Sequence, residues 1–510
     1  MASPKAAINS VRGTQDIAPA DFEKRRYVWQ KMENVFRRFG YDGVEVPTLE
    51  YIDLHLRKSG EKIRRHMYNF KDFGNDTLCL RPEFTASVVR LFNSKLTSEK
   101  LPQKLYYHGS TFRYDKPQKG RYREFTQAGM ELIGGATPEY DAECIALSIQ
   151  ATEALGLLDY EVVIGHIGIL LEILQQKKID DRVASYLIES LEILSKAENI
   201  EAGIAEIEEG LNAIGVSLDE LPEDQQSLVQ SVKNLPQEEV QKVVSWVVDT
   251  IYGEGVHACD SDTIAQNMLA KLHREEQRSL VRDTLMFIRK LVDIKGKPEE
   301  VFPKVDALLA EYNLDPKPLD ELKAIAKYLN HYGVDWNKVS IDFGFGRGLA
   351  YYTGMIFEMY VYSDNLGVEQ KQVLGGGRYD SLVQDLGNPN PIPACGFSFG
   401  VERMILAMED YEAKSKLNAF IVVRGDDTEF CYGLDVLDQM RKADISTDIG
   451  EKGKSVKAQM KMADSKNVGF VVIVAEDEMA KKEVSVKNMQ TSEQSQLSIP
   501  AMIDLIKGVA

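Results

Sequence analysis

The chain is 510 residues long, 44% of them hydrophobic and 27% charged, and it carries a formal net charge of -18. This composition is that of an ordinary globular protein, and the length predicts two or three domains rather than one core. The acidic balance argues against a protein that wraps nucleic acid non-specifically, because phosphate binding needs clustered cations.

Signals for targeting and for metal binding are sparse. No apolar run approaches the roughly 18 residues that a membrane-spanning helix needs, and the first residues lack the apolar segment of a secretory signal. The five cysteines are scattered with no CxxC pair, and the seven histidines form no HExxH motif. We therefore expect reduced thiols in a cytoplasmic protein, with no metal ion held tightly by protein ligands.

The N-terminal region predicts a helix followed by a strand. Residues 19–39 place Phe22, Trp29 and Phe36 at helical spacing. The segment YDGVEVPTLEY then reads as a strand. Pro47 indicates an edge or an end there, because proline cannot donate a ladder hydrogen bond.

Residues 104–133 predict a long antiparallel hairpin. The strands KLYYHGSTFRY and RYREFTQAGMELI flank the turn DKPQKG. Successive strand side chains alternate between faces, so Arg123, Gln127 and Glu131 share one face. A buried core face does not normally carry such residues without partners. The pattern therefore indicates a hairpin that lines a polar cavity.

Beyond the hairpin the pattern becomes helical and then returns to strands. Residues 166–334 are acidic and helical in pattern, with eleven acidic residues against two lysines between 201 and 250, and predict an inserted helical domain. Strands resume at 338, and ACGFSFGVERMILAME predicts a strand that runs into a helix. From 415 to 510 strands and helices alternate, as in a small α/β module.

Four arginines stand out as candidate ligands for anions. Arg113 and Arg121 lie in the hairpin and Arg403 lies in FGVER. A planar, permanently charged guanidinium suits phosphates and carboxylates, although each arginine taken singly is as well explained by a surface salt bridge. The segment GFGRG does not complete a GxGxxG loop, so it favours a glycine-flanked Arg347 that a ligand approaches closely, with a structural bulge as the alternative.

A second group of polar residues could hold an ammonium or an imidazole. Glu83 lies in LRPEFTA, and Gln127 and Glu131 lie on the polar face of the hairpin. Carboxylate and amide oxygens accept hydrogen bonds from the N–H groups of both ligands. Singly, each of the three is as well explained by a structural hydrogen bond.

Five segments in the right order resemble the histidyl-tRNA synthetases, a family of class II aminoacyl-tRNA synthetases. They are VRGTQDIAP, the first helix with VEVPTLE, TFRYDKPQKGRYREFTQ, GRGLAYYTG with its companion GGGRYD, and GFSFGVERM. The resemblance is strong over residues 8–165 and 335–410 and weaker over 415–510. It implies a homodimer and an α+β fold, with a class II catalytic domain on a mainly antiparallel sheet at 1–165 and 335–412, a helical insertion domain at 166–334, and a C-terminal α/β anticodon-binding domain at 415–510.

The resemblance also implies the activity and the residues that serve it. The chain would activate L-histidine with ATP, which carries Mg²⁺, and transfer histidine to the 3′ end of tRNA(His). Arg113 and Arg347 would be the catalytic residues, beside the α-phosphate and the substrate carboxylate, and Arg121 and Arg403 would bind the outer phosphates. The histidine-binding residues would be Glu83, Thr85 and Gln127 around the ammonium and carboxylate, and Glu131, Tyr351, Tyr352 and Tyr379 around the imidazole.

Five lysines are candidate contacts to tRNA. Lys116 and Lys119 lie in the hairpin turn, where the resemblance places the acceptor end of tRNA. Lys454, Lys457 and Lys461 are three and four residues apart and would form one basic face of a helix. The alternative for these three is a solvated helix face without a partner.

Three other functions are alternatives to histidine activation and tRNA charging. A regulatory subunit of ATP phosphoribosyltransferase would keep the fold and bind histidine, but would be expected to lose the arginines and the C-terminal module. A synthetase for proline or threonine is disfavoured by RGLAYYTG. A non-catalytic RNA-binding or signalling protein on the same scaffold is disfavoured by the set of ATP-site arginines. Two positions depart from the family pattern, Phe84 and Ala350.

Overall fold

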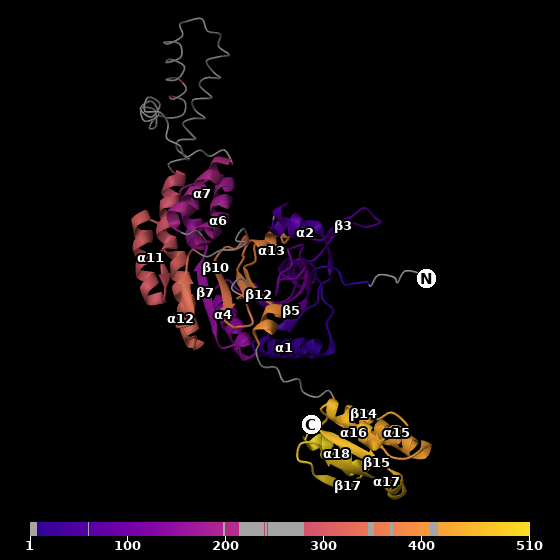
Figure 1. Ribbon diagram of the computed structural model, residues 1–510. Coiled ribbons are helices and arrows are strands. Elements are labelled where there is room, and N and C mark those ends of the chain that lie inside the picture. Colours follow the sequence, from indigo (N-terminus) through magenta and orange to yellow (C-terminus); the bar gives the residue numbers. More distant parts are fainter. Residues whose placement is uncertain are drawn as a thin grey trace. The chain divides into compact units, whose positions relative to one another are not determined.

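The computed structural model describes residues 8–59, 61–196, 199–213, 239, 242, 280–344, 351–367, 371–408 and 417–509. The predicted site residue Arg347 and the neighbouring Ala350 lie outside these residues. The chain divides into two compact units, residues 1–410 and 411–510 (Figure 1). No helix among the described residues is long and apolar enough to cross a membrane.

A sheet of nine strands forms the centre of the first unit. In spatial order the strands are β1 (Asp42–Gly43), β5 (Gln103–Phe112), β6 (Glu124–Ile133), β12 (Ala394–Gly400), β11 (Gln372–Arg378), β10 (Met355–Val361), β7 (Tyr160–His166), β9 (Val339–Asp342) and β8 (Lys295–Gly296). All pairs from β5 to β7 are antiparallel, whereas β1–β5 and β7–β9 are parallel. The predicted α+β fold on a mainly antiparallel sheet is confirmed.

Three helices, α1 (Pro19–Arg38), α4 (Pro138–Glu153) and α12 (Lys317–His331), pack against one face of this sheet (Figure 1). The buried face of α1 is apolar at helical spacing and includes Met32 and Phe36. Met130 and Leu132 of β6 belong to the same core. Because strand side chains alternate, Gln127 and Glu131 face the other side of the sheet, as predicted.

The predicted strand YDGVEVPTLEY is wrong as a single element. Its first part is β1, which pairs with β5, and its last part is β2 (Leu49–Tyr51). β2 belongs to a separate three-stranded sheet with β4 (Thr77–Leu80) and β3 (Asn69–Lys71). Pro47 lies between the two parts, where its missing N–H breaks no ladder. Around this small sheet lie α2 (Ile52–Ser59), the 3₁₀ turn η1 (Glu61–His66), α3 (Thr85–Leu91) and η2 (Phe92–Leu96).

The region from 166 to 334 is helical where it is described. It contains α5 (Gly168–Gln176), α6 (Asp181–Lys196), α7 (Ile200–Ala213), α11 (Pro298–Tyr312) and α12. It also supplies β8, which pairs with β9 at the edge of the main sheet, and α12 packs on α4. The apolar side chains of these helices are continuous with the core of the main sheet. The predicted domain boundaries at 166 and 334 stay a prediction.

The predicted strand running into a helix is confirmed as β12 followed directly by α14 (Val401–Ala407). A further short helix, α13 (Leu382–Asp385), follows β11. β12 pairs with β6 so that Gly396 lies opposite Glu131 and Gly400 opposite Gln127. A side chain at position 396 would collide with the Glu131 carboxylate. The sheet thus places two segments that are far apart in the sequence side by side, with glycine where the carboxylate needs the space.

The second unit is an α/β module, as predicted. Its sheet has the order β14 (Thr447–Ile449), β13 (Ala419–Val423), β15 (Phe470–Val474), β16 (Glu483–Asn488) and β17 (Gln494–Ser498). β13 is parallel to β14 and β15, and β16 and β17 add on as antiparallel strands. The helices are α15 (Asp427–Lys442), α16 (Val456–Ser465), α17 (Glu476–Lys481) and α18 (Ile499–Val509).

Candidate active site

A cavity of about 840 Å³ lies over the face of the main sheet that carries Gln127. This volume is within the range of sites that hold small molecules. Its walls come from β6, β11 and β12, from α2 and α3, from the segment between β5 and β6, and from Ile188 and Glu189 of α6. Nine of the predicted site residues line it, namely Glu83, Thr85, Arg113, Arg121, Gln127, Tyr351, Tyr352, Tyr379 and Arg403.

Two arginines approach the cavity from different parts of the chain. Arg113 follows the end of β5, and its Nε donates to the carbonyl oxygen of Pro82 at 2.9 Å. Burial lowers the pKa of Arg113, and the nearby Glu83 carboxylate opposes this shift. Arg403 lies in the first turn of α14; its Nη1 donates to the carbonyl oxygen of Gln372 and its Nε to that of Gly120 at 3.3 Å. The backbone contacts fix both guanidinium groups at the cavity wall.

Arg121 is held by an ion pair within its own loop. Its Nη2 lies 2.8 Å from Asp115 Oδ2, and His66 Nδ1 lies 3.1 Å from the other oxygen of Asp115. Although burial works in the opposite direction, these contacts lower the pKa of Asp115. Arg121 is exposed, so this pair is screened by water and can open at little cost when an anion of higher charge binds.

Glu131 is fully buried and is not among the cavity-lining residues; it lies directly behind two of them, Tyr379 and Gly396. The hydroxyl of Tyr107 donates to Glu131 Oε1 at 3.2 Å, and the hydroxyl of Tyr379 donates to Oε2. Burial raises the pKa of Glu131 to about 7, against the hydrogen bond from Tyr379 that lowers it. Beside it the rings of Tyr351 and Tyr352 lie 4.3 Å apart, centroid to centroid. The tyrosines of the cavity wall therefore cover a buried carboxyl whose pKa is about 7.

Glu83 is surrounded by donors from two helices. Its Oε2 accepts from Lys58 Nζ at 2.9 Å, and its Oε1 accepts from the backbone N–H of Ala86 at 3.2 Å. His55 Nδ1 lies 3.2 Å from Oε1. Burial alone would raise the pKa of Glu83, but the charge of Lys58 and the His55 hydrogen bond prevail and lower it. Glu83 is thus ionised throughout the neutral range.

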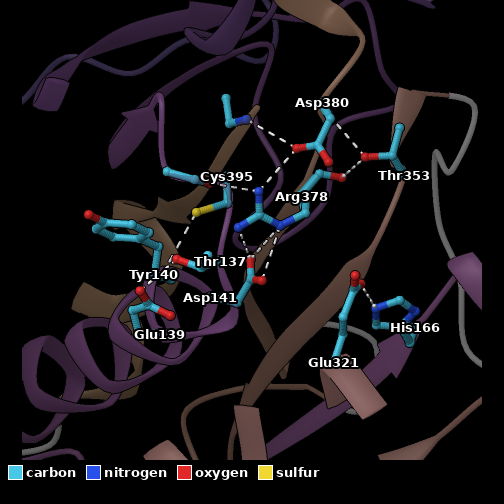
Figure 2. Close-up of polar contacts among 12 residues, drawn as sticks. Thr137, Glu139, Tyr140, Asp141, His166, Glu321, Thr353, Arg378, Asp380 and Cys395 are labelled. Atoms are coloured by element: carbon cyan, nitrogen blue, oxygen red, sulfur yellow. Dashed lines mark hydrogen bonds and ion pairs between the residues drawn. The ribbon is translucent and has the colours of Figure 1, made fainter. Parts of the chain in front are cut away.

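A buried ion pair behind the cavity anchors β11, which ends at Arg378 directly before Tyr379. Figure 2 shows Arg378 between two carboxylates, with its Nη2 2.9 Å from Asp141 Oδ1 and its Nη1 3.1 Å from Asp380 Oδ1. Although burial opposes it, Asp141 raises the pKa of Arg378. The backbone N–H of Thr353 donates to the carbonyl oxygen of Arg378 at 2.8 Å. Since Thr353 follows Tyr352, the same anchor fixes two tyrosines of the pocket.

The remaining predicted residues lie elsewhere. Lys116 is exposed and is not among the cavity-lining residues, and Lys119 Nζ donates to the carbonyl oxygen of Asn365 at 2.8 Å. Lys454, Lys457 and Lys461 belong to the second unit and are exposed. The prediction of one helix face for these three lysines is wrong in part. Ser455 caps α16 by accepting from the N–H of Ala458, so Lys454 precedes the helix and only the other two lie on it.

Comparison with known proteins decides the family. The family model described as histidyl-tRNA synthetase matches residues 13–252 and 259–404. The chain belongs to the histidyl-tRNA synthetase family. A second model, described as an anticodon binding domain, matches residues 419–508 of this histidyl-tRNA synthetase family member.

Relatives and a solved structure agree with this assignment. The histidine–tRNA ligase of Thermococcus kodakarensis is 31% identical and covers 99% of this chain and 99% of its own length. That of Methanocaldococcus jannaschii is 31% identical and covers 96% of this chain and 97% of its own length. The crystal structure of apo histidyl-tRNA synthetase from S. aureus has a TM-score of 0.63 at 25% identity, covering 98% of this chain and 100% of that one.

Sequence reasoning missed several residues of this histidyl-tRNA synthetase site. Lys58 and His55 lie in a segment without a recognisable motif, and only their burial in the fold reveals them. Glu402 could have been identified from the sequence, because it is a charged residue directly before Arg403 at the start of a predicted helix. Its carboxylate accepts from the backbone N–H of Thr126 and from Arg25, and so joins α14 to β6 and α1.

The polar side chains at the site also bear on metal binding. Within the described ranges, no three His, Cys, Asp or Glu side chains lie close enough together to hold a metal ion. The donors that face the cavity are mostly cations and hydroxyl groups. They suit phosphate oxygens and an imidazole better than they suit a resident cation.

Proposed function

We propose that the chain is an ATP-dependent histidine–tRNA ligase that forms histidyl-adenylate and transfers histidine to the 3′ end of tRNA(His). One observation carries this proposal. A single cavity is lined by Arg113, Arg121 and Arg403 and by Tyr379, whose hydroxyl donates to the buried Glu131 carboxyl directly behind it. Such a site offers cations to a triphosphate and a hydrogen-bond acceptor to an imidazole N–H.

In the first step the histidine carboxylate attacks the α-phosphorus of ATP, and pyrophosphate leaves with its bond electrons. Charge develops on phosphoryl oxygens, so positioned cations supply most of what the protein must add. Arg113 is proposed to hold the α-phosphate beside the carboxylate, and Arg121 and Arg403 to hold the outer phosphates. Arg347 is proposed to act with Arg113. Mg²⁺ enters with ATP and neutralises the phosphate oxygens.

In the second step the terminal ribose hydroxyl of tRNA attacks the carbonyl carbon of the adenylate, and AMP leaves. Lys116 and Lys119 beside the cavity are proposed to contact the acceptor end. Lys454, Lys457 and Lys461 are proposed to contact the tRNA through the C-terminal unit. The match of that unit to an anticodon binding domain supports this role.

Histidine selection is proposed to rest on hydrogen bonding inside the aromatic pocket. Glu83, Thr85 and Gln127 would hold the ammonium and carboxylate, while Glu131 and the tyrosines Tyr351, Tyr352 and Tyr379 would enclose the ring. A side chain that leaves Glu131 unpaired would be rejected strongly, by roughly 10⁴-fold in kcat/KM for sites of this kind. We also propose the domain boundaries given above, a homodimer, and a cytoplasmic location.

The deciding experiment is ATP–pyrophosphate exchange with each of the twenty amino acids, followed by charging of tRNA(His) with radioactive histidine. We expect exchange with histidine alone, and charging of tRNA(His) alone. Histidine binding without exchange would instead indicate a regulatory subunit such as that of ATP phosphoribosyltransferase. Exchange with proline or threonine would also overturn the proposal.

A further inference from the structure

A lysine of the protein forms an ion pair with Glu83, the carboxylate that is proposed to bind the ammonium group of the substrate. Lys58 lies in the last turn of α2, its side chain is only 4% exposed, and its Nζ is 2.9 Å from Glu83 Oε2. The same Nζ lies 4.4 Å from the centre of the Tyr351 ring. Both Lys58 and Glu83 line the cavity. A primary ammonium group of the protein thus already makes the contact expected of the amino acid.

The Glu83 carboxylate has little capacity left for a second cation. Its Oε1 accepts from the backbone N–H of Ala86 and lies 3.2 Å from His55 Nδ1, and its Oε2 accepts from Lys58. A second ammonium at Oε2 would stand beside Lys58 in a site shielded from water, where like charges repel strongly. The bound amino acid and Lys58 therefore compete for one oxygen.

We propose that Lys58 is an internal counter-ion that holds the place of the amino-acid ammonium on Glu83 and is displaced when the amino acid binds. The inference rests on the proposed function of Glu83 as a ligand for histidine. The Tyr351 ring gives the displaced ammonium a second favourable contact, because a cation is attracted to the face of a tyrosine ring. Lys58 then acts on the substrate by competition and on Glu83 by electrostatics.

The counter-ion keeps Glu83 ionised before the amino acid binds. A buried carboxylate without a cation takes up a proton, and a protonated Glu83 could not pair with an ammonium. Lys58 keeps Glu83 ionised at all neutral pH values, in exchange for weaker binding of the amino acid. The exchange also selects ligands. A deaminated analogue, 3-(imidazol-4-yl)propanoate, has no group with which to displace Lys58.

Several other charged and titratable groups surround Glu83, and they matter because the test uses pH. Besides Lys58, the groups that interact with it electrostatically are His55 of α2, Tyr107 of β5, Arg113 after β5, Glu131 of β6, and Tyr351 before β10. All of these remain in a Lys58 variant. Lys58 also lowers the pKa of Glu131. The ratio of variant to wild-type affinity is therefore measured at each pH in a Glu131→Gln background, where the substrate imidazole titrates alike in both proteins.

The variant Lys58→Met removes the charge and keeps the length of the side chain. We expect histidine to bind the variant at least as tightly as wild type at about pH 8.5, because the competitor is gone. We expect weaker binding as pH falls, because Glu83 then loses its charge; each unit of pKa above the assay pH weakens binding about tenfold. Calorimetric titration with histidine and with histidinol, which has the ammonium but no carboxylate, measures this without any turnover.

Three outcomes would overturn the inference. A variant-to-wild-type ratio that does not change with pH would show that Glu83 does not depend on Lys58. Weaker binding of histidine but not of histidinol at about pH 8.5 would mean that Lys58 binds the substrate carboxylate instead. Tight binding of 3-(imidazol-4-yl)propanoate to wild type, unchanged in the variant, would remove the competition argument.

Matched variants keep the test decisive. Lys58→Arg retains a charge and should keep the wild-type pH profile. The inference is supported if the pH profile of histidine binding changes in Lys58→Met and does not change in Lys58→Arg. If Lys58→Met does not fold, Lys58→Gln, which can still donate to Glu83, replaces it. Wild type is assayed first for histidine-dependent exchange. If wild type shows no histidine-dependent exchange, the proposed function is refuted. If wild type shows normal exchange but Lys58→Met binds histidine with the wild-type pH profile, only the counter-ion proposal is refuted.

Discussion

Replacing Glu131 with glutamine tests the imidazole pocket most directly, because the change removes a charge and almost no volume. Glu131 is fully buried behind the cavity wall and accepts hydrogen bonds from the hydroxyls of Tyr107 and Tyr379. Burial raises the pKa of its carboxyl to about 7. Wild type therefore presents a carboxylate mainly above that pH, and the variant presents none at any pH.

The size of the effect follows from the hydrogen bond that is lost. A hydrogen bond to a charged group contributes about 1.5–3 kcal/mol, which corresponds to roughly ten- to hundredfold in kcat/KM. We expect Glu131→Gln to lower kcat/KM for histidine by that factor at about pH 8, with KM for ATP unchanged. Since wild type loses its carboxylate as pH falls through about 7, the gap between the two enzymes should narrow in acid.

The same raised pKa predicts the opposite effect on stability. The folded-state pKa of Glu131 is about 7, against an ordinary value of 4.5, so the native state binds more protons between these values. The free energy of unfolding therefore falls as pH rises through this window. Glutamine has no charge to bury, so the variant should melt at or above the wild-type temperature at about pH 8 when compared by calorimetry.

Two results would refute this reasoning about Glu131. Equal kcat/KM for histidine in both enzymes at about pH 8 would show that the carboxylate does not contact the ring. A gap that widens as pH falls would show that the titrating group is elsewhere. Pyrophosphate exchange as a function of pH, with the melting temperature measured in the same buffers, distinguishes both from a general loss of folding.

Three further predictions concern the rest of the site and the second unit. Arg403→Lys keeps the charge but loses the guanidinium fork, and should reduce exchange by roughly 10²-fold with the melting temperature unchanged; wild-type exchange would contradict the phosphate role. Arg378→Met leaves the buried carboxylate of Asp141 unpaired and should lower the free energy of unfolding by about 3–5 kcal/mol in a urea titration. Lys457→Ala with Lys461→Ala should weaken tRNA(His) binding and flatten its salt dependence while exchange with histidine is unaffected; unchanged tRNA affinity would contradict the contact.

The hairpin shows how far the sequence predicts the fold. Alternating side chains and a Pro/Gly turn identify its two strands, and β5 and β6 are confirmed. The strands end earlier than predicted, at Phe112 and Glu124. Arg123 leaves the ladder because its backbone N–H donates to the carbonyl oxygen of Gly13 and its guanidinium stacks over Tyr114. Those contacts come from tertiary packing, which local periodicity does not encode.

The candidate site shows the same division. Arginines and glutamates within motifs could be assigned from the sequence, because charged residues on a strand that should be buried require partners. Lys58 and His55 could not be assigned from the sequence, because nothing in it distinguishes them from other polar residues of a short helix. Their burial follows from the packing of α2 on α3. Asp141 and Arg378 likewise meet only because α4 packs against the sheet, although they are far apart in the sequence.

The pKa values of Glu83 in the cavity wall and of Glu131 directly behind the wall are shifted in opposite directions, and the difference would suit two different groups of one amino acid. Glu83 has cationic and hydrogen-bonding neighbours that lower its pKa, so it stays ionised and suits an α-ammonium that is always charged near neutrality. Glu131 has only hydroxyl donors, so burial prevails and its pKa is about 7. An imidazole has an ordinary pKa of about 6.5, so ring and carboxyl compete for a proton on nearly equal terms.

This match gives the pocket a chemical criterion beyond shape. In the proposed complex the ionised carboxyl of Glu131 would accept a hydrogen bond from the ring N–H, and its charge would not be left unpaired. A side chain that is always cationic would force Glu131 to ionise fully in a dry site, and an apolar side chain would leave it without a partner. Under the proposed function, the buried carboxyl of Glu131 would therefore select a ring whose pKa is close to its own.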